Sequence, residues 1–133
     1  MAITIVRDQT APMRLEVRVG PHLLYADASV SDGGGGLGPN PHDLYDAALG
    51  ACESLTVLLY ANRKGIPVEN LEVTVERNQS EERSGIYRLH GKLKISGKLT
   101  DAQRRELLSV ASKCPVYKLM TSVKTMIETS LAE

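Results

Sequence analysis

The sequence has no excess of charge of either sign, since 16 of its 133 residues are lysine or arginine and 16 are aspartate or glutamate. A chain without net charge gives no electrostatic reason to expect binding to nucleic acid or to an anionic membrane. The longest apolar run, residues 47–61, is interrupted by polar side chains and is shorter than the ~20 residues of a membrane span. Residues 1–8 also lack the basic start and apolar stretch of a signal peptide. We therefore expect a cytoplasmic protein.

Motifs for metals and nucleotides are lacking as well. His22, His42 and His90 show no zinc-ligand spacing with the cysteines. The glycine-rich residues 33–38 formally satisfy the GxGxxG fingerprint of dinucleotide-binding proteins. However, residues 39–41 separate them from the next helix, and no parallel βαβ unit follows. We expect a flexible loop there, with no metal and no cofactor.

Cysteine is scarce, with Cys52 and Cys114 as its two occurrences. In a reducing cytoplasm a permanent structural disulfide between them is not expected. One interpretation is that both are small core residues, because free cysteine is often buried. The other is a reactive pair, in which one thiol becomes a sulfenic acid and the second condenses with it to a disulfide. The residues by themselves leave both interpretations open.

Apolar and polar residues alternate in several segments, and this period of two is typical of half-buried strands. The first three predicted strands form an antiparallel meander, the next two a hairpin, and the last ends the chain. The first of these strands begins at Ile3, and the others cover residues 13–19, 22–29, 71–76, 87–95 and 123–131.

A long helix is predicted over residues 41–64. Asn40 is a strong N-cap with Pro41 at the first helical position, and Gly65 follows the last turn as a left-handed C-cap. The middle of this helix is apolar on most faces, so it must be buried on most faces. A chain of this size can hardly enclose it alone, and we therefore expect a partner subunit.

A second helix begins at Thr100, where Thr100 and Gln103 form a capping box. It ends near Cys114, because the residue before a proline avoids helical angles, and a short helical turn is predicted over residues 116–121. The order of strands, long helix, hairpin, helix and strand indicates an α+β fold. We expect one domain over residues 1–133.

Cys52 cannot be activated by its own helix. It lies twelve residues after Asn40, roughly 18 Å along the axis, whereas the helix dipole acts only near the first turn. An apolar environment would raise the pKa of the thiol. A reactive Cys52 therefore needs a cation from another segment, and Arg7, Arg14 and Arg18 on the N-terminal strands are the candidates.

Four motifs resemble the OsmC/Ohr family of osmotically inducible and organic hydroperoxide resistance proteins. They occur in the family's order and span most of the chain from the glycine loop onward. The motifs are GPNPHDL (residues 38–44), AALGAC (47–52), YANRKG (60–65) and CPVYK (114–118).

The resemblance implies an intertwined homodimer, with curved antiparallel sheets around the long central helices. It also implies a thiol peroxidase that reduces organic hydroperoxides and is regenerated by a small dithiol or a lipoylated protein. In this family pattern Cys52 matches the peroxidatic cysteine and Cys114 the resolving cysteine.

Two residues depart from the pattern of the family's peroxidases and place the chain in the broader OsmC-like group. His42 stands where a glutamate holds the catalytic arginine, and Tyr117 stands where many relatives have histidine. Because His42 precedes Cys52 by about 15 Å along an unbroken helix, we expect it to reach that thiol from the other subunit. The loss of the glutamate keeps an alternative open, a non-enzymatic stress-associated dimer that binds an apolar ligand or senses redox state.

Glu53 follows Cys52 but points about 100° away from it on a helix. It could pair with an arginine or face a neighbouring subunit. A solvated surface position is the other interpretation.

Overall fold

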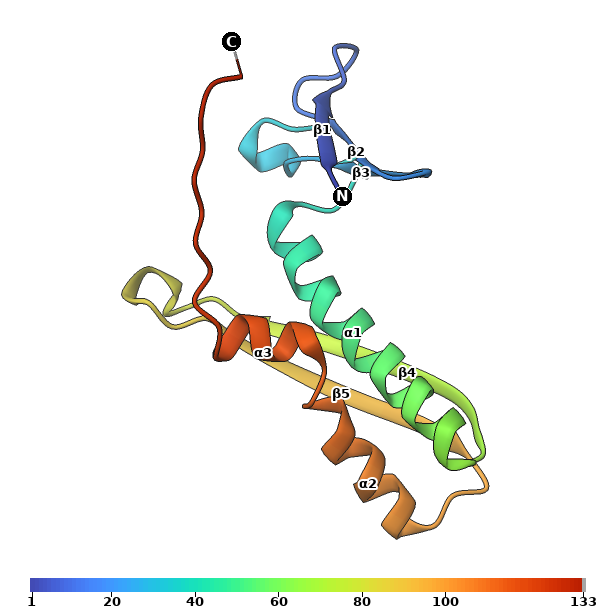
Figure 1. Ribbon diagram of the computed structural model, residues 1–133. Coiled ribbons are helices and arrows are strands. Elements are labelled where there is room, and N and C mark those ends of the chain that lie inside the picture. The colour runs from blue at the N-terminus through green and yellow to red at the C-terminus, as the bar shows by residue number, and fades with distance from the viewer. Residues whose placement is uncertain (133) are drawn as a thin grey trace. The chain divides into compact units, whose positions relative to one another are not determined.

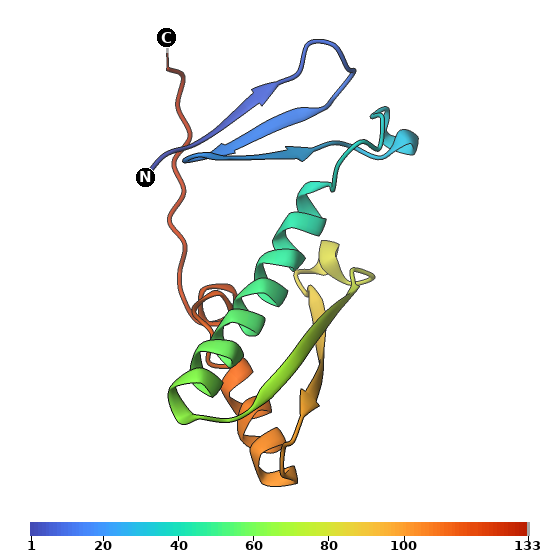
Figure 2. The ribbon, with the colours of Figure 1, turned by 90° about the vertical axis from the view of Figure 1, so that its right-hand side faces the viewer.

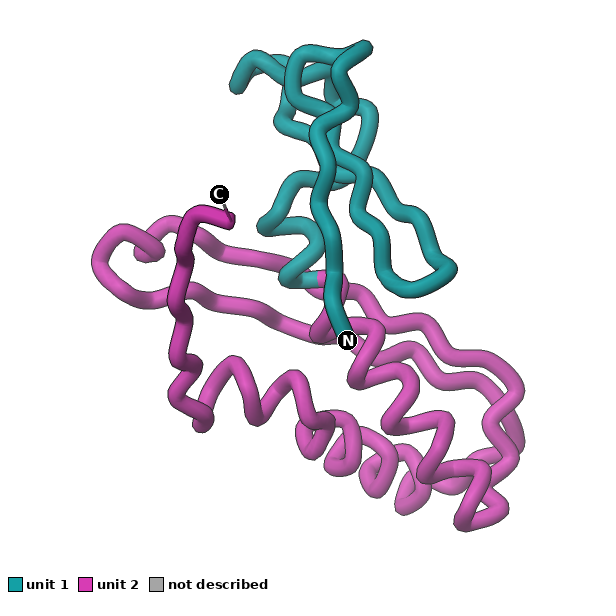
Figure 3. The backbone as a smooth tube through the Cα atoms, turned by 45° about the horizontal axis from the view of Figure 1, so that its top comes forward, with its two compact units in different colours: residues 1–46 teal, residues 47–133 magenta. Residues whose placement is uncertain are grey.

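The computed structural model describes residues 1–132. Two compact units, Met1–Asp46 and Ala47–Glu133, make up the chain (Figure 3). The boundary between them falls within the long helix α1, Pro41–Lys64. Antiparallel sheets and helices occur together, so the predicted α+β class is confirmed. A single domain over residues 1–133 stays a prediction.

The first unit contains a three-stranded antiparallel sheet in the order β1-β2-β3 (Figure 1). Its strands are β1 (Ile3–Arg7), β2 (Leu15–Val19) and β3 (His22–Ala26). The predicted third strand extended to residue 29, but β3 ends earlier. Asp27 explains this end, since its carboxylate accepts hydrogen bonds from the backbone N–H groups of Ala28 and Leu37 and holds the chain in a loop. A short 3-10 helix, Val30–Asp32, follows.

Helix α1 has the predicted bounds because both of its ends are capped locally. Asn40 Oδ1 accepts the Asp43 N–H at 2.8 Å, and Asp43 Oδ2 accepts the Asn40 N–H at 3.0 Å. Gly65 ends the helix with a φ of +67°, a left-handed conformation that favours glycine. Although α1 has 24 residues, neither it nor any other helix among residues 1–132 has the length and apolarity to cross a membrane.

The second unit is built on an antiparallel hairpin of β4 (Val68–Asn78) and β5 (Arg88–Gly97), with a 3-10 helix, Glu82–Ser84, in its turn. Helices α2 (Asp101–Ala111) and α3 (Pro115–Thr121) follow. The predicted capping box of α2 is present: the Gln103 N–H bonds Thr100 Oγ1 at 3.1 Å, and the Thr100 N–H bonds Gln103 Oε1 at 3.0 Å.

The core of the second unit lies where α1 and α2 cover the same face of the β4–β5 hairpin (Figures 1 and 2). Val57 of α1 and Leu107 of α2 are completely buried there. The hairpin contributes Leu71, Leu93 and Ile95. On β4 the inward and outward side chains alternate as the sequence pattern predicts.

Within this single chain α1 is buried along one stripe only. Leu49, Glu53, Val57 and Ala61 follow each other at four-residue spacing and are buried. Leu55, Leu58 and Leu59 on the other faces stay exposed. The prediction that the helix is buried nearly all round is therefore not met within one chain, which leaves a large apolar surface uncovered.

The predicted last strand is wrong for the chain described here. Residues 123–132 contain no strand, and Met126, Ile127 and Leu131 are exposed. Alternation shows which side chains would share a face, but a strand also needs a hydrogen-bonded neighbour. Residues 1–132 supply no such neighbour to this segment.

Candidate active site

The two cysteines interact within the second unit. Cys52 lies near the middle of α1 and is partly exposed, whereas Cys114 directly precedes α3 and is completely buried. Both are free thiols, and Cys52 acts on the Cys114 thiol strongly enough to raise its pKa. The fold therefore brings together two residues that are far apart in the sequence, with only one of them open to solvent.

The environment of Cys114 favours its protonated form. Burial has the largest effect and raises the pKa of the thiol, and Cys52 and Glu53 raise it further. The Tyr117 N–H opposes them by donating a hydrogen bond to Cys114 Sγ at 3.3 Å. The net effect is a raised pKa, so Cys114 is a neutral thiol at physiological pH.

A glycine lets this part of α1 approach the hairpin closely. A Cβ atom at Gly50 would lie 3.0 Å from Val75 Cγ2 on β4, closer than nearly all real contacts of this kind. Ser54 bonds back to the same turn, donating its hydroxyl to the Gly50 carbonyl at 2.7 Å. The turn that carries Cys52 is therefore held against β4.

Glu53 is buried, with 7% of its surface exposed. Its carboxylate lies over Gly91 of β5, where a Cβ atom would be 3.0 Å from Oε1. Burial raises the pKa of the Glu53 carboxyl, and this carboxyl in turn acts on the charge of Cys114. The interpretation of Glu53 as a solvated surface residue is wrong, and within residues 1–132 it forms no ion pair with an arginine.

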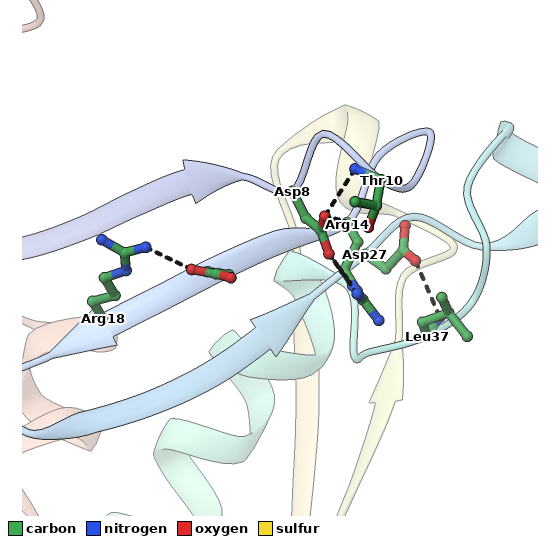
Figure 4. A network of polar contacts seen from close by, with 7 residues as sticks. Asp8, Thr10, Arg14, Arg18, Asp27 and Leu37 are labelled. Carbon is green, nitrogen blue, oxygen red and sulfur yellow. Dashed lines mark hydrogen bonds and ion pairs between the residues drawn. The ribbon is translucent and has the colours of Figure 1, made fainter.

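In the first unit, Arg14 is the best-fixed of the three candidate arginines (Figure 4). It forms an ion pair with Asp8, in which its Nε donates to Oδ2 at 2.8 Å. The guanidinium also lies 5.2 Å from the centre of the Tyr25 ring. Hydrogen bonds from Thr10 and then the Arg14 guanidinium lower the pKa of Asp8 to about 2.

The other two arginines are held less firmly. Arg18 is exposed and pairs with Glu16 Oε2 at 2.7 Å (Figure 4). Arg7 donates to the Pro12 carbonyl at 3.4 Å. Exposed pairs of this kind fix a side chain weakly, so Arg14 is the guanidinium of the sheet with the most defined position.

His42 lies in the first turn of α1, in the first unit. It lines an open pocket of about 580 Å3 whose walls come from β2, the loop after β3 and the start of α1. Met13, Leu15 and Ala26 form apolar parts of its wall, and Asp27 a polar part. Tyr117, another predicted site residue, lies in the second unit. Its side chain is exposed, and its backbone N–H donates a hydrogen bond to Cys114 Sγ.

No group of three or more His, Cys, Asp and Glu side chains that could hold a metal ion occurs among residues 1–132. Sequence reasoning missed the role of Gly91, which leaves space for the Glu53 carboxylate. The signal was present, because an isolated glycine within an alternating strand pattern indicates a close approach by another part of the molecule.

The chain is similar to known proteins in both sequence and structure. Residues 33–129 match the family of OsmC-like proteins. No curated protein matches the chain.

Three solved structures illustrate the structural similarity. A candidate osmotic stress induced and detoxification response protein from Psychrobacter arcticus 273-4 has 18% identity and a TM-score of 0.77, with 92% of this chain and 89% of that chain covered. An OsmC-like protein from Mycoplasma pneumoniae has 22% identity and a TM-score of 0.74, with 92% and 87% covered. The organic hydroperoxide resistance protein OsmC from Legionella pneumophila has 22% identity and a TM-score of 0.65, with 92% and 90% covered.

At these identities the solved structures show a shared fold, and the family match over most of the chain confirms the resemblance carried by the four motifs. The chain belongs to the OsmC-like protein family.

Proposed function

We propose that this protein is a thiol-dependent peroxidase that reduces organic hydroperoxides. The observation that carries the proposal is the pair of free thiols in the second unit, one partly exposed and one completely buried, that interact with each other. An exposed thiol can meet an oxidant, and a buried thiol beside it can resolve the product before further oxidation. The similarity to an organic hydroperoxide resistance protein supports the same substrate class.

In the first proposed step the Cys52 thiolate attacks one peroxide oxygen of the hydroperoxide. An S–O bond forms, the O–O bond breaks, and the departing alkoxide takes a proton from water and leaves as the alcohol. Cys52 is oxidised to a sulfenic acid, and the hydroperoxide is reduced. Cys114 then attacks the Cys52 sulfur, so that a disulfide forms and water leaves.

A small dithiol or a lipoylated protein regenerates the enzyme by thiol–disulfide exchange, in which its own thiols are oxidised to a disulfide. In the cytoplasm, where we place the protein, such a disulfide is transient. The proposed reaction needs no metal or cofactor, because the two cysteines and the dithiol carry both electrons.

The proposed cation for the Cys52 thiolate is an arginine of the N-terminal sheet. The dipole of α1 does not extend to Cys52. Arg14 is the first candidate because Asp8 and the Tyr25 ring fix its guanidinium, and Arg7 and Arg18 are the others. In the proposed site His42 and Tyr117 have supporting positions.

We also propose that the protein works as a homodimer. Leu55, Leu58 and Leu59 of α1 are exposed in the single chain, and residues 123–132 have an apolar alternation without a strand partner. A second copy would cover both features. Analytical ultracentrifugation tests this: a monomer at micromolar concentration would refute it.

The central experiment follows hydroperoxide consumption with dihydrolipoamide as reductant, in wild type, Cys52→Ser and Cys114→Ser. Cys52→Ser is expected to abolish turnover. Cys114→Ser is expected to consume about one equivalent of hydroperoxide and then stall on this dithiol. Undiminished activity of Cys52→Ser would overturn the proposal. If wild type consumes no hydroperoxide but still forms the Cys52–Cys114 disulfide, the redox-sensing alternative holds instead.

A further inference from the structure

A side-chain hydrogen bond joins the two helices that lead to the cysteines. Tyr60 of α1 donates its hydroxyl to Glu106 Oε2 of α2, and both side chains are half-buried. The two residues are 46 positions apart in the sequence. Tyr60 is also the first residue of the YANRKG motif of residues 60–65, which has no part in the reaction steps proposed above.

The Tyr60 side chain is fixed by several contacts. Its ring packs against the core cluster that contains Val57 and Leu107, and the Lys64 ammonium lies 5.8 Å from the ring centre. The hydrogen bond to the Glu106 carboxylate raises the pKa of Tyr60, so the hydroxyl keeps its proton at neutral pH and stays a donor. Tyr60 and Glu106 therefore tie α1 to α2 at one defined point.

This bond sets a register that also applies to the cysteines. Helices α1 and α2 run in opposite directions along the hairpin (Figures 1 and 2). Cys52 precedes Tyr60 by eight residues on α1. Cys114 follows Glu106 by eight residues in the segment formed by α2 and its extension. Equal steps in opposite sequence directions lead to facing positions on two antiparallel segments. Both cysteines thus lie about 12 Å from the bond, roughly two helical turns, and at the same end of the helix pair.

Cys52 and Tyr60 also lie on the same side of α1. Each of them directly precedes a residue of the buried stripe, Glu53 for Cys52 and Ala61 for Tyr60, and residues at four-residue spacing share a helix face. Both side chains are partly exposed. The effect of Cys52 on the Cys114 thiol agrees with this placement.

The backbone after α2 transmits the position of Glu106 to Cys114. The helix ends at Ala111. The Lys113 N–H then donates to the Val110 carbonyl at 2.9 Å, and the Cys114 N–H donates to the Ala111 carbonyl at 3.3 Å. These bonds continue the last turn of α2 as far as Cys114, which is completely buried. A shift of α2 along α1 would therefore move Cys114 with it.

We propose that Tyr60 and Glu106 are positioning residues for the two cysteines. Their hydrogen bond sets the register of α1 against α2 and thereby holds Cys114 opposite Cys52. Apolar contacts between the helices are non-directional, whereas a hydrogen bond requires its donor and acceptor to face each other. The bond raises the effective concentration of one thiol for the other, as correct orientation does for reacting groups. This role rests on the proposed function, which needs the Cys52–Cys114 disulfide.

The experiment measures the equilibrium between the two free thiols and their intrachain disulfide in buffers of reduced and oxidised glutathione, without hydroperoxide. Cys52 and Cys114 are oxidised to the disulfide as one oxidised glutathione is reduced to two thiols, and peptide mapping by mass spectrometry gives the oxidised fraction. Tyr60→Phe keeps the ring and removes the donor, and Glu106→Ala removes the acceptor. We expect each to lower the effective concentration of the thiol pair about tenfold, within the range of coupling through a shared backbone. Glu106→Gln keeps an oxygen acceptor and should stay close to wild type.

A control variant separates loss of position from loss of stability. Thr100→Ala removes the N-cap side chain of α2 and destabilises that helix, but it leaves the Tyr60–Glu106 bond in place. Its effective concentration should equal that of wild type. The double variant Tyr60→Phe, Glu106→Ala should lose no more than either single variant, because the same bond is absent in all three. Far-ultraviolet circular dichroism checks that every variant is folded.

Unchanged effective concentrations in Tyr60→Phe and Glu106→Ala overturn the proposal, and so does an equal loss in Thr100→Ala. A wild type that forms no disulfide in these buffers also overturns it, because the register would then not bring the thiols together. Failure of the proposed function gives a different result. If the disulfide forms and depends on Tyr60, but no hydroperoxide is consumed, the positioning role holds and the peroxidase function does not.

Discussion

The Cys114 thiol accepts a hydrogen bond from the Tyr117 N–H at 3.3 Å and so caps α3 with the same side chain that faces Cys52. Its structural and redox roles can be separated. Cys114→Ser retains a capping oxygen, whereas Cys114→Ala leaves the N–H without its partner. We expect Cys114→Ala to be less stable than Cys114→Ser by about 1 kcal/mol, measured by urea unfolding.

Both Cys114 variants should nevertheless lose the disulfide equally, because neither retains the second sulfur. After one equivalent of hydroperoxide, the Cys52 sulfenic acid should persist in both and be trapped by dimedone. Equal stability of the two variants would contradict the capping role. Rapid loss of the sulfenic acid without added thiol would contradict the resolving role.

Glu53 should make the stability of the fold depend on pH. Burial raises the pKa of its carboxyl above the ordinary value of 4.5, so the folded state prefers the protonated form. Its stabilising contribution is present below pH 4.5 and is lost as the pH rises through the raised pKa. Glu53→Gln should therefore be at least as stable as wild type at neutral pH, and this advantage should shrink in acid.

Thermal unfolding of wild type and Glu53→Gln between pH 4 and pH 8 measures this effect. A neutral-pH Tm of Glu53→Gln clearly below that of wild type would show that the carboxylate stabilises the fold.

Asp8 should have the opposite pH dependence. Hydrogen bonds from Thr10 and the Arg14 guanidinium lower the pKa of Asp8 from 3.8 to about 2. The stability that this carboxylate contributes is present above pH 3.8 and is lost as the pH falls toward about 2. We expect Asp8→Asn to be less stable than wild type at pH 5. As the pH falls from 3.8 toward about 2, the variant should lose less stability than wild type, as followed by circular dichroism. Parallel acid unfolding curves would contradict this.

Two neighbouring leucines of α2 offer a matched test of the core. Leu107 is completely buried, whereas Leu108 is 59% exposed. Leu107→Ala should cost about 2–5 kcal/mol of unfolding free energy because it leaves a cavity between α1, α2 and the hairpin. Leu108→Ala should change it by no more than about 0.5 kcal/mol. If urea unfolding of the purified protein shows that both variants lose a similar amount of unfolding free energy, Leu108 takes part in an intermolecular contact.

Elements with strong local signals were predictable from the sequence. The N-cap Asn40 and the C-cap Gly65 act within one turn of the helix ends, so the bounds of α1 followed without knowledge of the rest of the fold. The capping box at Thr100 is equally local. The alternation of residues 123–131 was just as clear, but a strand also depends on a neighbour that local pattern does not contain.

The candidate site depended on contacts between distant segments. The motifs around Cys52 and Cys114 indicated the family, but helical geometry did not indicate that the two thiols interact. The partner of Arg14 was equally hidden, since Asp8 is joined to it across the turn between β1 and β2.

The sequence by itself determined the ends of α1, the start of α2, the β4–β5 hairpin and the family, because these depend on local hydrogen bonds, periodicity and motifs. Only the tertiary structure decided the states of the functional groups. Cys114 and Glu53 are buried by segments distant in the sequence, and Gly91 of β5 leaves the space that the Glu53 carboxylate of α1 occupies. Burial and charge act through space, so the protonation of these groups depends on neighbours that lie far away in the chain.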